Sequence, residues 1–297
     1  MPVREKWPAV RRTKRPCVII AGSVTYDTIV REGACFRKIG GVSAYAGLTF
    51  RLHGIRTAAA CNVAPRDRRV RNLFRQYDIL VCDGPTPVTT RFVNVQTGDS
   101  RRQEAPRLAD PVRLIPLLPL LKSVAHVHLG PLHPADLHPE WLAILSRVHK
   151  TVSLDVQGYV RKIRDGRVFP AVSKRLPEAL RLSRFVKADS EEMAVILERF
   201  RMKIETFQDT FGIDELLVTS GRRGGTLRLA SGEQIAYEAC PAGRESDTTG
   251  AGDVLFAAYL ARRLYRNESP DASIRHAARI AADQVAGRFI ASETLLI

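Results

Sequence analysis

The sequence predicts an α/β protein with a three-layer, doubly wound and mostly parallel sheet and a small β-sheet lid. Short apolar runs of strand length alternate along the chain with helical patterns, which is typical of parallel βαβ units. Two early segments instead alternate polar with apolar residues, which suits a separate sheet with one exposed face. Apolar residues make up 45% and charged residues 26% of the 297 positions, close to globular averages, and this excludes a disordered chain.

The elements follow in order along the chain. The first expected strand covers residues 17–21, and residues 27–30 alternate as a lid strand would. Residues 89–96, followed by a turn at 97–100, predict a hairpin. Further strands are expected at 57–63, 124–129, 151–156, 185–188 and 215–219, and helices at 43–52, 139–149, 191–201, 204–211 and 254–263. We therefore expect one domain over residues 17–297, with lid segments at about 27–41 and 86–104.

Charge sets the chain apart, because 46 Lys and Arg face 31 Asp and Glu, a formal net charge of +15. Residues 1–16 hold six of the basic residues against one glutamate and contain no apolar segment like that of a secretory signal, so we interpret them as a basic, flexible arm. No apolar run reaches the ~18 residues that a membrane helix needs. The five cysteines form no Cys-x-x-Cys pair, which argues against a disulfide framework and fits a reducing cytoplasm.

The strongest motif is Asp247-Thr248-Thr249-Gly250-Ala251-Gly252-Asp253, which leads directly into the helix expected at 254–263. A helix N-terminus offers unpaired backbone N–H groups and the positive end of the helix dipole, so this turn predicts an anion site. Gly250 and Gly252 let the backbone approach the anion closely. Beside a phosphate, Asp253 would accept a proton from an attacking hydroxyl. Helix capping explains one aspartate and one glycine but not the whole turn.

This turn resembles the C-terminal signature of the ribokinase-like (PfkB) carbohydrate kinase family. Four other segments resemble motifs of that family in the same order: Gly22-Ser23-Val24-Thr25-Tyr26-Asp27, Gly40-Gly41, Asp189-Ser190-Glu191-Glu192 and Thr219-Ser220-Gly221-Arg222-Arg223-Gly224. The resemblance extends from Cys17 to the C-terminal helices. It implies the ribokinase-like fold and the phosphorylation of a hydroxyl on a sugar, polyol or nucleoside, with ATP and Mg²⁺ as cofactors.

The resemblance also implies a role for each matching residue. Asp253 would be the catalytic base, and the amides of Gly250, Ala251 and Gly252 would stabilise the charge on the transferred phosphoryl group. Substrate binding falls to Asp27, Gly40, Gly41 and Tyr45, and nucleotide binding to Thr219, Gly221, Gly224 and Thr248. Glu192 and Asp189 would hold Mg²⁺ through water.

Two positions depart from the family pattern. The family usually places an asparagine that touches the substrate after the two glycines, and here that position is Tyr45, which suggests an acceptor other than ribose. Asp189 replaces another asparagine and adds a negative charge near the metal. Residues 154–161 resemble a variant found in branches that include inositol and nucleoside kinases.

The lid would close over the acceptor and exclude water. Because its exposed strands are edges that can pair with another chain, we expect a homodimer through the lid. We expect neither a membrane nor a specific nucleic acid as a partner.

Two alternatives compete with the kinase hypothesis. His126 and His128 flank one residue on an expected strand, with His133 and His138 close behind, as in a metal-dependent hydrolase. The basic clusters at 66–71 and 101–102 instead suggest a nucleic-acid-binding protein, although they lack the interleaved aromatic residues of stacking platforms.

Overall fold

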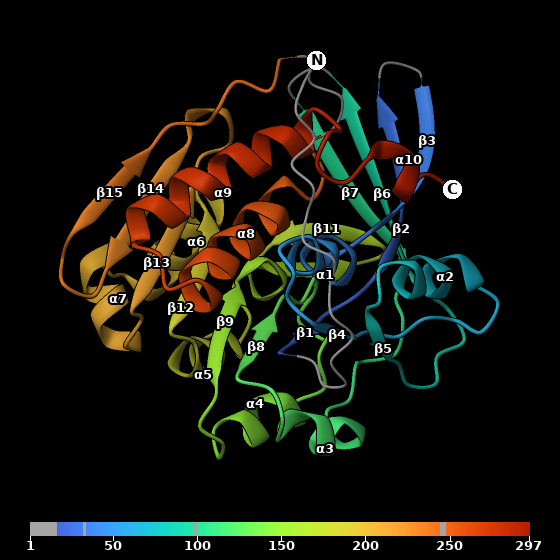
Figure 1. Cartoon of the computed structure of the whole chain (residues 1–297), viewed down its shortest axis with the longest axis horizontal. Coiled ribbons are helices and arrows are strands. Elements are labelled where there is room, and N and C mark those ends of the chain that lie inside the picture. The colour runs from blue at the N-terminus through green and yellow to red at the C-terminus, as the bar shows by residue number, and fades with distance from the viewer. Residues whose placement is uncertain (1–16, 32–33, 98–99, 244–247) are drawn as a thin grey trace.

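The computed structural model describes residues 17–31, 34–97, 100–243 and 248–297. The expected arm at 1–16, the centre of the hairpin turn at 98–99 and Asp247 lie outside these residues. The described residues form two sheets, a large one at the centre and a smaller one beside it (Figure 1).

The large sheet confirms the predicted doubly wound core. Its nine strands run in the order β15 (Gln234–Tyr237), β14 (Gly225–Leu229), β13 (Glu215–Thr219), β12 (Phe185–Asp189), β9 (Thr151–Asp155), β8 (His126–Leu129), β1 (Val18–Ala21), β4 (Thr57–Ala60) and β5 (Leu80–Cys82). Neighbouring strands from β13 to β5 are parallel, whereas β14 and β15 add antiparallel pairs at one edge. The carboxyl ends of the parallel strands therefore meet at one edge of the sheet, where ligands bind in such folds.

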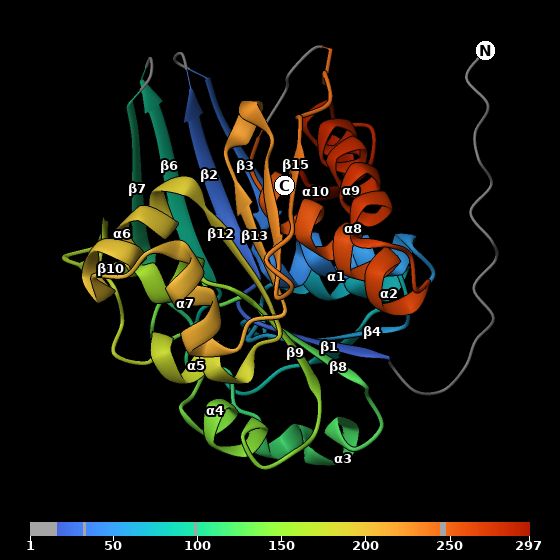
Figure 2. The ribbon, with the colours of Figure 1, turned by 90° about the vertical axis from the view of Figure 1, so that its left-hand side faces the viewer.

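Helices cover both faces of this sheet, so the sheet and its two helical layers make three layers. One face carries α1 (Val42–Leu52), α2 (Arg68–Gln76), α8 (Ala251–Tyr265) and α9 (Pro270–Val285). The other carries α3 (Leu118–Leu121), α4 (Glu140–Leu145), α5 (Leu176–Leu182), α6 (Ser190–Phe200) and α7 (Ile204–Phe211). Figure 2 shows the two groups of helices on opposite sides of the strands. Helix α4 ends earlier than the sequence predicted, where the Ser146 hydroxyl donates to the Ala143 carbonyl.

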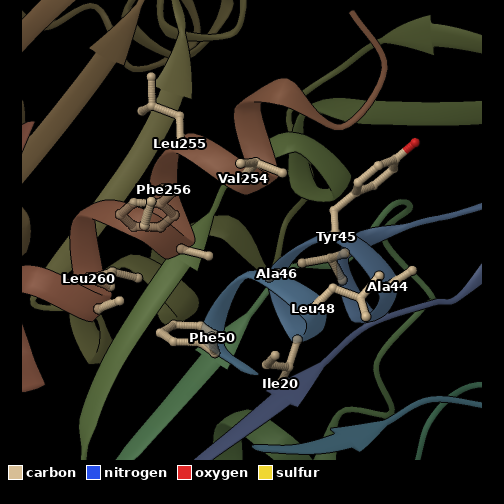
Figure 3. Close-up of a cluster of buried hydrophobic side chains, with 14 of the residues drawn as sticks. Ile20, Ala44, Tyr45, Ala46, Leu48, Phe50, Val254, Leu255, Phe256 and Leu260 are labelled. Atoms are coloured by element: carbon tan, nitrogen blue, oxygen red, sulfur yellow. The ribbon is translucent and has the colours of Figure 1, made fainter. Parts of the chain in front are cut away.

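The core between α1, α8 and the sheet positions the site. Phe50 of α1 and Phe256 of α8 are fully buried side chains, and Ile20 of β1 lies beneath them (Figure 3). Burying a side chain of this size contributes about 1.5–3 kcal/mol. The packing fixes the N-termini of both helices next to each other, and each N-terminus begins at a glycine, Gly41 for α1 and Gly250 for α8.

The smaller sheet is the predicted lid, and it contains more of the chain than the sequence indicated. Its order is β10 (Arg161–Arg164), β11 (Arg167–Pro170), β7 (Ser100–Arg107), β6 (Thr90–Thr97), β2 (Thr25–Arg31) and β3 (Ala34–Gly40). The β10–β11 hairpin was not expected in the lid, although its Asp165-Gly166 turn is a typical hairpin signal.

The lid edge at β3 is partly covered by residues that follow α10 (Ser292–Leu295). Leu296 forms an antiparallel bridge with Lys38, and the Ile297 N–H donates to the Arg37 carbonyl at 3.0 Å. A homodimer through this edge stays a prediction, and it would involve the part of β3 before Arg37.

Candidate active site

A cavity of about 590 Å³ lies between the lid and the carboxyl ends of the large sheet's strands. Its lining brings together residues from every motif of the sequence analysis. Twelve of the fourteen predicted site residues line it, namely Asp27, Gly41, Tyr45, Asp189, Thr219, Gly221, Gly224, Thr248, Gly250, Ala251, Gly252 and Asp253. Gly40 and Glu192 lie immediately behind the wall, where each contacts a lining residue.

The glycine-rich turn forms the N-terminus of α8 and faces the cavity. Gly250 has φ +80°, a left-handed conformation that other residues rarely adopt. A Cβ at this position would also overlap the ring of Tyr45. The backbone N–H groups of the first turn of α8 therefore reach the cavity unobstructed, as an anion site requires.

Asp253 lies in this first turn of α8 and lines the cavity. Burial, together with the negative charge of Asp155, raises the pKa of Asp253 to about 7, while Lys187 and Arg161 oppose the rise. Asp27 also contributes to the rise. A carboxylate with a pKa near neutral pH is suited to general base catalysis.

Asp27 projects from β2 at the lid side of the cavity. The Thr25 hydroxyl donates to its Oδ1 at 2.7 Å, which fixes the carboxylate. A Cβ at Gly40 on the neighbouring strand would overlap Oδ2 of Asp27. Gly40 is therefore needed to make room for Asp27 rather than to touch a ligand itself.

Tyr45 is a buried residue of the first turn of α1, and its ring packs on Gly250 (Figure 3). Lys38 of the lid lies 5.4 Å from the centre of the same ring. The side chain thus contacts both a lid lysine and the α8 turn at the wall of the cavity.

Asp189 and Glu192 form a capping box at the start of α6. Oδ1 of Asp189 accepts from the Glu192 N–H at 2.7 Å, and Oε2 of Glu192 accepts from the Asp189 N–H at 2.9 Å. Burial raises the pKa of Glu192 to about 7. The pattern that the sequence analysis assigned to Mg²⁺ thus also caps the N-terminus of α6, and Asp189 lines the cavity from that cap.

At the other end of the cavity the walls become apolar. Thr219 ends β13, Gly221 and Gly224 follow it, and all three line the same cavity as the small residues of α9. The apolar wall consists of Ala239, Cys240, Pro241, Ala242, Ala278, Ala281, Ala282 and Val285. The compartment combines a flat apolar space with a nearby anion site.

Sequence reasoning missed a buried ion pair in the cavity floor. Lys187 of β12 donates from Nζ to Oδ2 of Asp155 at the end of β9, at 2.8 Å, and both side chains are buried. A lysine inside an otherwise apolar parallel strand is costly unless it is paired, and that signal was present in Phe185–Asp189. The Asn94 and Gln103 pair of the lid, at 2.8 Å, was also missed.

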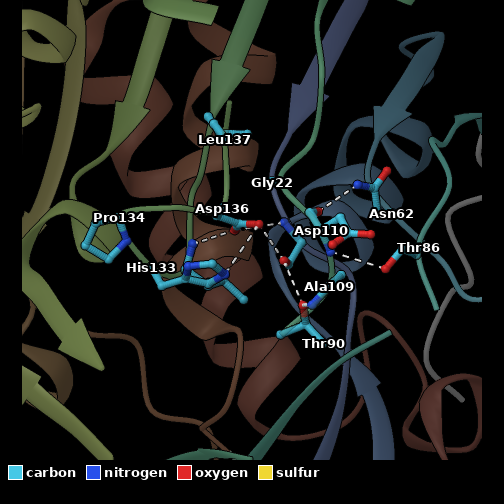
Figure 4. Close-up of polar contacts among 12 residues, drawn as sticks. Gly22, Asn62, Thr86, Thr90, Ala109, Asp110, His133, Pro134, Asp136 and Leu137 are labelled. Atoms are coloured by element: carbon cyan, nitrogen blue, oxygen red, sulfur yellow. Dashed lines mark hydrogen bonds and ion pairs between the residues drawn. The ribbon is translucent and has the colours of Figure 1, made fainter. Parts of the chain in front are cut away.

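A network around Asp136 fixes the lid to the core (Figure 4). Its carboxylate accepts from the Ser23 hydroxyl at 2.6 Å and from the Ser23 and Leu132 N–H groups. Ser23 also contacts Thr90 at 3.3 Å, and Thr90 accepts from the Ala109 N–H. Because these residues precede or flank the lid strands, the network positions the lid relative to the sheet.

The metal-hydrolase interpretation loses its structural basis. His126 and His128 do not line the cavity: both are buried, and each bonds to the Ser153 hydroxyl at 2.8 Å. Among the described residues, no group of three or more His, Cys, Asp or Glu could hold a metal. In the basic cluster at 66–71, Arg71 is bound to the Val63 and Ala64 carbonyls and to Asp83.

A doubly wound α/β domain with a lid over a glycine-rich helix N-terminus and a buried carboxylate in its first turn is typical of a small-molecule kinase, a phosphotransferase with an alcohol group as acceptor. The model of the pfkB family carbohydrate kinases matches residues 83–288. The chain belongs to this family, which confirms the resemblance drawn from its motifs.

Solved structures of similar fold include several kinases of the ribokinase family. A pyrophosphate-dependent kinase complexed with a pyrophosphate analog and myo-inositol has a TM-score of 0.76 at 21% identity, covering 90% of this chain and 94% of that one. A nucleoside kinase of Burkholderia thailandensis in complex with inosine has a TM-score of 0.72 at 16% identity, with 91% and 90% covered. Ribokinase of Arabidopsis thaliana, complexed with ribose and ATP, has a TM-score of 0.69 at 18% identity, with 92% and 93% covered.

These likenesses show the ribokinase-like fold over nearly the whole chain. No curated protein matches the sequence. None of the helices in the described part of the chain is long and apolar enough to cross a membrane.

Proposed function

We propose that the chain is an ATP-dependent kinase that transfers the γ-phosphoryl group to a hydroxyl of a sugar, a polyol such as an inositol, or a nucleoside. The observation that carries the proposal is Asp253, whose pKa is raised to about 7 at the N-terminus of a helix that faces the cavity. In the reaction, the acceptor oxygen bonds to the γ-phosphorus as the bond to the β-phosphate oxygen breaks. Asp253 takes the hydroxyl proton, and ADP leaves.

The acceptor end of the cavity is polar. Asp27, Asn94 and Gln103 line it from the lid, and Gln157 lines it from the loop after β9. Carboxylate and amide groups side by side match neighbouring hydroxyls of a ring, as in a sugar or an inositol. Relatives of the same fold hold myo-inositol, inosine and ribose, which supports the same three acceptor classes here.

The donor end supports a nucleotide rather than pyrophosphate. The wall formed by residues 239–242 and α9 is apolar, and Arg222 lines the same cavity from the loop after β13. A nucleobase would bury its flat surface against the apolar wall. Pyrophosphate would leave this compartment unused. The side chains of this apolar wall are small, which leaves room for the ring of a nucleobase.

Mg²⁺ fits this site as an ion held by phosphate oxygens and water. The described residues form no cage of three or more ligands, and Mg²⁺ keeps several waters by preference. Asp189, which lines the cavity, would bind one of those waters, and Glu192 would fix Asp189 through the capping box. When bound, the ion neutralises phosphate charge and orients the γ-phosphoryl group.

Assays that combine candidate acceptors with each of two phosphoryl donors test the proposal. Sugars, inositols and nucleosides are first ranked by thermal shift in the presence of a non-hydrolysable ATP analogue, since a ligand of the native state raises its apparent stability. The best acceptors are then assayed with ATP or pyrophosphate and Mg²⁺, and the products are identified by phosphorus NMR. We expect a monophosphate ester and ADP. Faster turnover with pyrophosphate than with ATP would overturn the donor assignment.

A further inference from the structure

The buried pair of Lys187 and Asp155 has no role in the reaction as described so far. Both residues line the cavity, and their side chains are only about one-twentieth exposed, at 6% and 5%. Asp155 is itself fixed, because its Oδ1 accepts from the Gln157 N–H at 3.1 Å. A buried ion pair contributes little net stability, since desolvation of both charges offsets their attraction. The pair is therefore better explained by what it does in the cavity.

The ammonium of Lys187 lies beside the anion site. A Cβ added at Gly252 would stand 3.1 Å from Nζ of Lys187, so the ammonium borders the first turn of α8. The N–H groups of that turn and the ammonium thus surround one space from two sides. A phosphoryl group bound at Gly252 would therefore lie next to Nζ of Lys187.

Carboxylates surround the ammonium of Lys187. Its Nζ donates to Oδ2 of Asp155 at 2.8 Å, and the charges of Glu192 and Asp253 act on it as well. Three carboxylates act on this ammonium, whereas a polyphosphate needs positive charge beside it, which Lys187 and Arg161 offer in the cavity lining. Lys187 is the buried cation among the described lining residues, and its Nζ borders the first turn of α8.

We propose that Lys187 is a further catalytic residue that binds the transferred phosphoryl group, and that Asp155 is a positioning residue that holds its ammonium next to Gly252. This proposal rests on the kinase function proposed above. As the γ-phosphorus leaves the β-phosphate oxygen and bonds to the acceptor oxygen, Lys187 donates hydrogen bonds to the moving group. It stays protonated throughout, and the hydroxyl proton goes to Asp253.

Four variants separate this role from a structural one. Lys187→Arg keeps the charge but moves it, and Asp155→Asn keeps the lysine but removes its anchor. Lys187→Met leaves Asp155 buried without a partner, which endangers folding, so the double variant Lys187→Met/Asp155→Asn removes both charges together. Lys162→Met is the matched control, because Lys162 lies on β10 and does not line the main cavity. Circular dichroism checks the fold of each variant.

The kinetic readout is kcat at saturating acceptor and donor. We expect kcat to fall about 10²–10³-fold in the double variant and in Lys187→Arg, with the acceptor KM changed only a few-fold. Lys162→Met keeps the wild-type kcat. A folded double variant with near wild-type kcat would overturn the proposal.

The pH profile supplies a readout that a structural role would not move. The groups that act on Asp253 are Asp155 and Asp27, which raise its pKa, and Lys187 and Arg161, which lower it. We therefore expect the acid limb of kcat/KM to move to lower pH in Asp155→Asn. In Lys187→Arg the limb stays close to wild type, because the charge remains. An Asp155→Asn profile that moves to higher pH would contradict this arrangement.

Binding distinguishes failure of this proposal from failure of the proposed function. Calorimetry compares ADP with AMP-PNP, and the wild type should gain affinity from the γ-phosphate, a gain that falls about tenfold in the double variant. If the wild type binds AMP-PNP but phosphorylates no acceptor, the proposed function fails while this comparison still decides on Lys187. An unchanged gain in the double variant would refute the contact.

Discussion

Two buried polar clusters share strand β9 of the large sheet and have opposite characters. Ser153 and Asp155 are two residues apart on β9, so their side chains emerge on the same face of the sheet. Ser153 joins His126 and His128 in a neutral cluster, whereas Asp155 joins Lys187 in a charged one. One step of about 7 Å along the strand separates the two.

The surroundings of the clusters explain the difference. Rings of Phe50 and Phe256 pack edge-on against the two histidines at 5.4–6.3 Å and close that cluster off. Burial lowers the pKa of both imidazoles, to about 4 for His128, so they stay neutral. The charged cluster instead opens into the cavity at the strand ends. Polar groups on the same strand are thus closed off from the cavity in one cluster and open to it in the other.

Around the cavity, into which the charged cluster opens, the largest loss of activity is expected from Gly250→Ala. A methyl group here meets the Tyr45 ring and a φ of +80°, so the turn must move and the anion site is lost. We expect kcat to fall about 10²–10³-fold. Gly54→Ala is the matched control, because Gly54 has φ +78° but nothing within 4 Å of the added Cβ. Its kcat should match wild type, and equal loss in both variants would show that backbone strain alone is responsible.

Acid pH should destabilise the fold through the enclosed cluster of His126, His128 and Ser153. The folded protein lowers the pKa of His128 from 6.5 to about 4, so its neutral form is favoured by folding. The stability this provides is complete above about pH 6.5 and is lost as the pH falls toward 4, by up to about 3 kcal/mol. Chemical denaturation between pH 8 and 4 measures this loss. His128→Asn should flatten the profile, and a profile as steep as wild type would contradict the assignment.

Removal of the hydroxyl that the two histidines share should have a smaller effect. Ser153→Ala leaves Nε2 of His126 and Nδ1 of His128 without their partner, and we expect a cost of about 1–3 kcal/mol. The melting temperature should fall by about 2–4 °C for each kcal/mol, while kcat stays unchanged. A loss of activity without a loss of stability would place this cluster in the reaction.

The smallest effect on stability and activity is expected for an exposed ion pair that belongs to neither cluster. Arg275 and Asp271 pair across one turn of α9 at 2.9 Å with both side chains largely exposed. Arg275→Ala should leave melting temperature and kcat unchanged within error, because water screens such pairs. A clear shift in melting temperature would show that surface charges matter more here than the comparison assumes.

The closed and open clusters also show what the sequence can reveal. The turn at Gly250–Asp253 was predictable because anion binding at a helix N-terminus is local: the glycines, the carboxylate and the helix are contiguous. The parallel strands were also predictable from a local signal, because each is a short contiguous apolar run. The pairing of Lys187 with Asp155 was not, since it joins residues 32 positions apart through the order of strands in the sheet.

Ambiguous patterns account for the remaining differences. His126 and His128 share a face as metal ligands would, and only the neighbouring strand shows that Ser153 satisfies them. Asp189 and Glu192 have the spacing of a capping box, and that spacing alone does not separate helix capping from metal binding. The β10–β11 hairpin had its own turn signal, but its pairing with β7 depends on the folded lid.

The most direct test of the central claim is the turnover of Asp253→Asn. Asparagine keeps the size of the side chain but cannot take the acceptor proton, so kcat should fall by about 10²–10⁴-fold. The variant should stay folded and bind AMP-PNP about as well as wild type, and the acid limb of the wild-type profile, near pH 7, should disappear. A kcat within a few-fold of wild type, with the same pH profile, would contradict the assignment of Asp253 as the base.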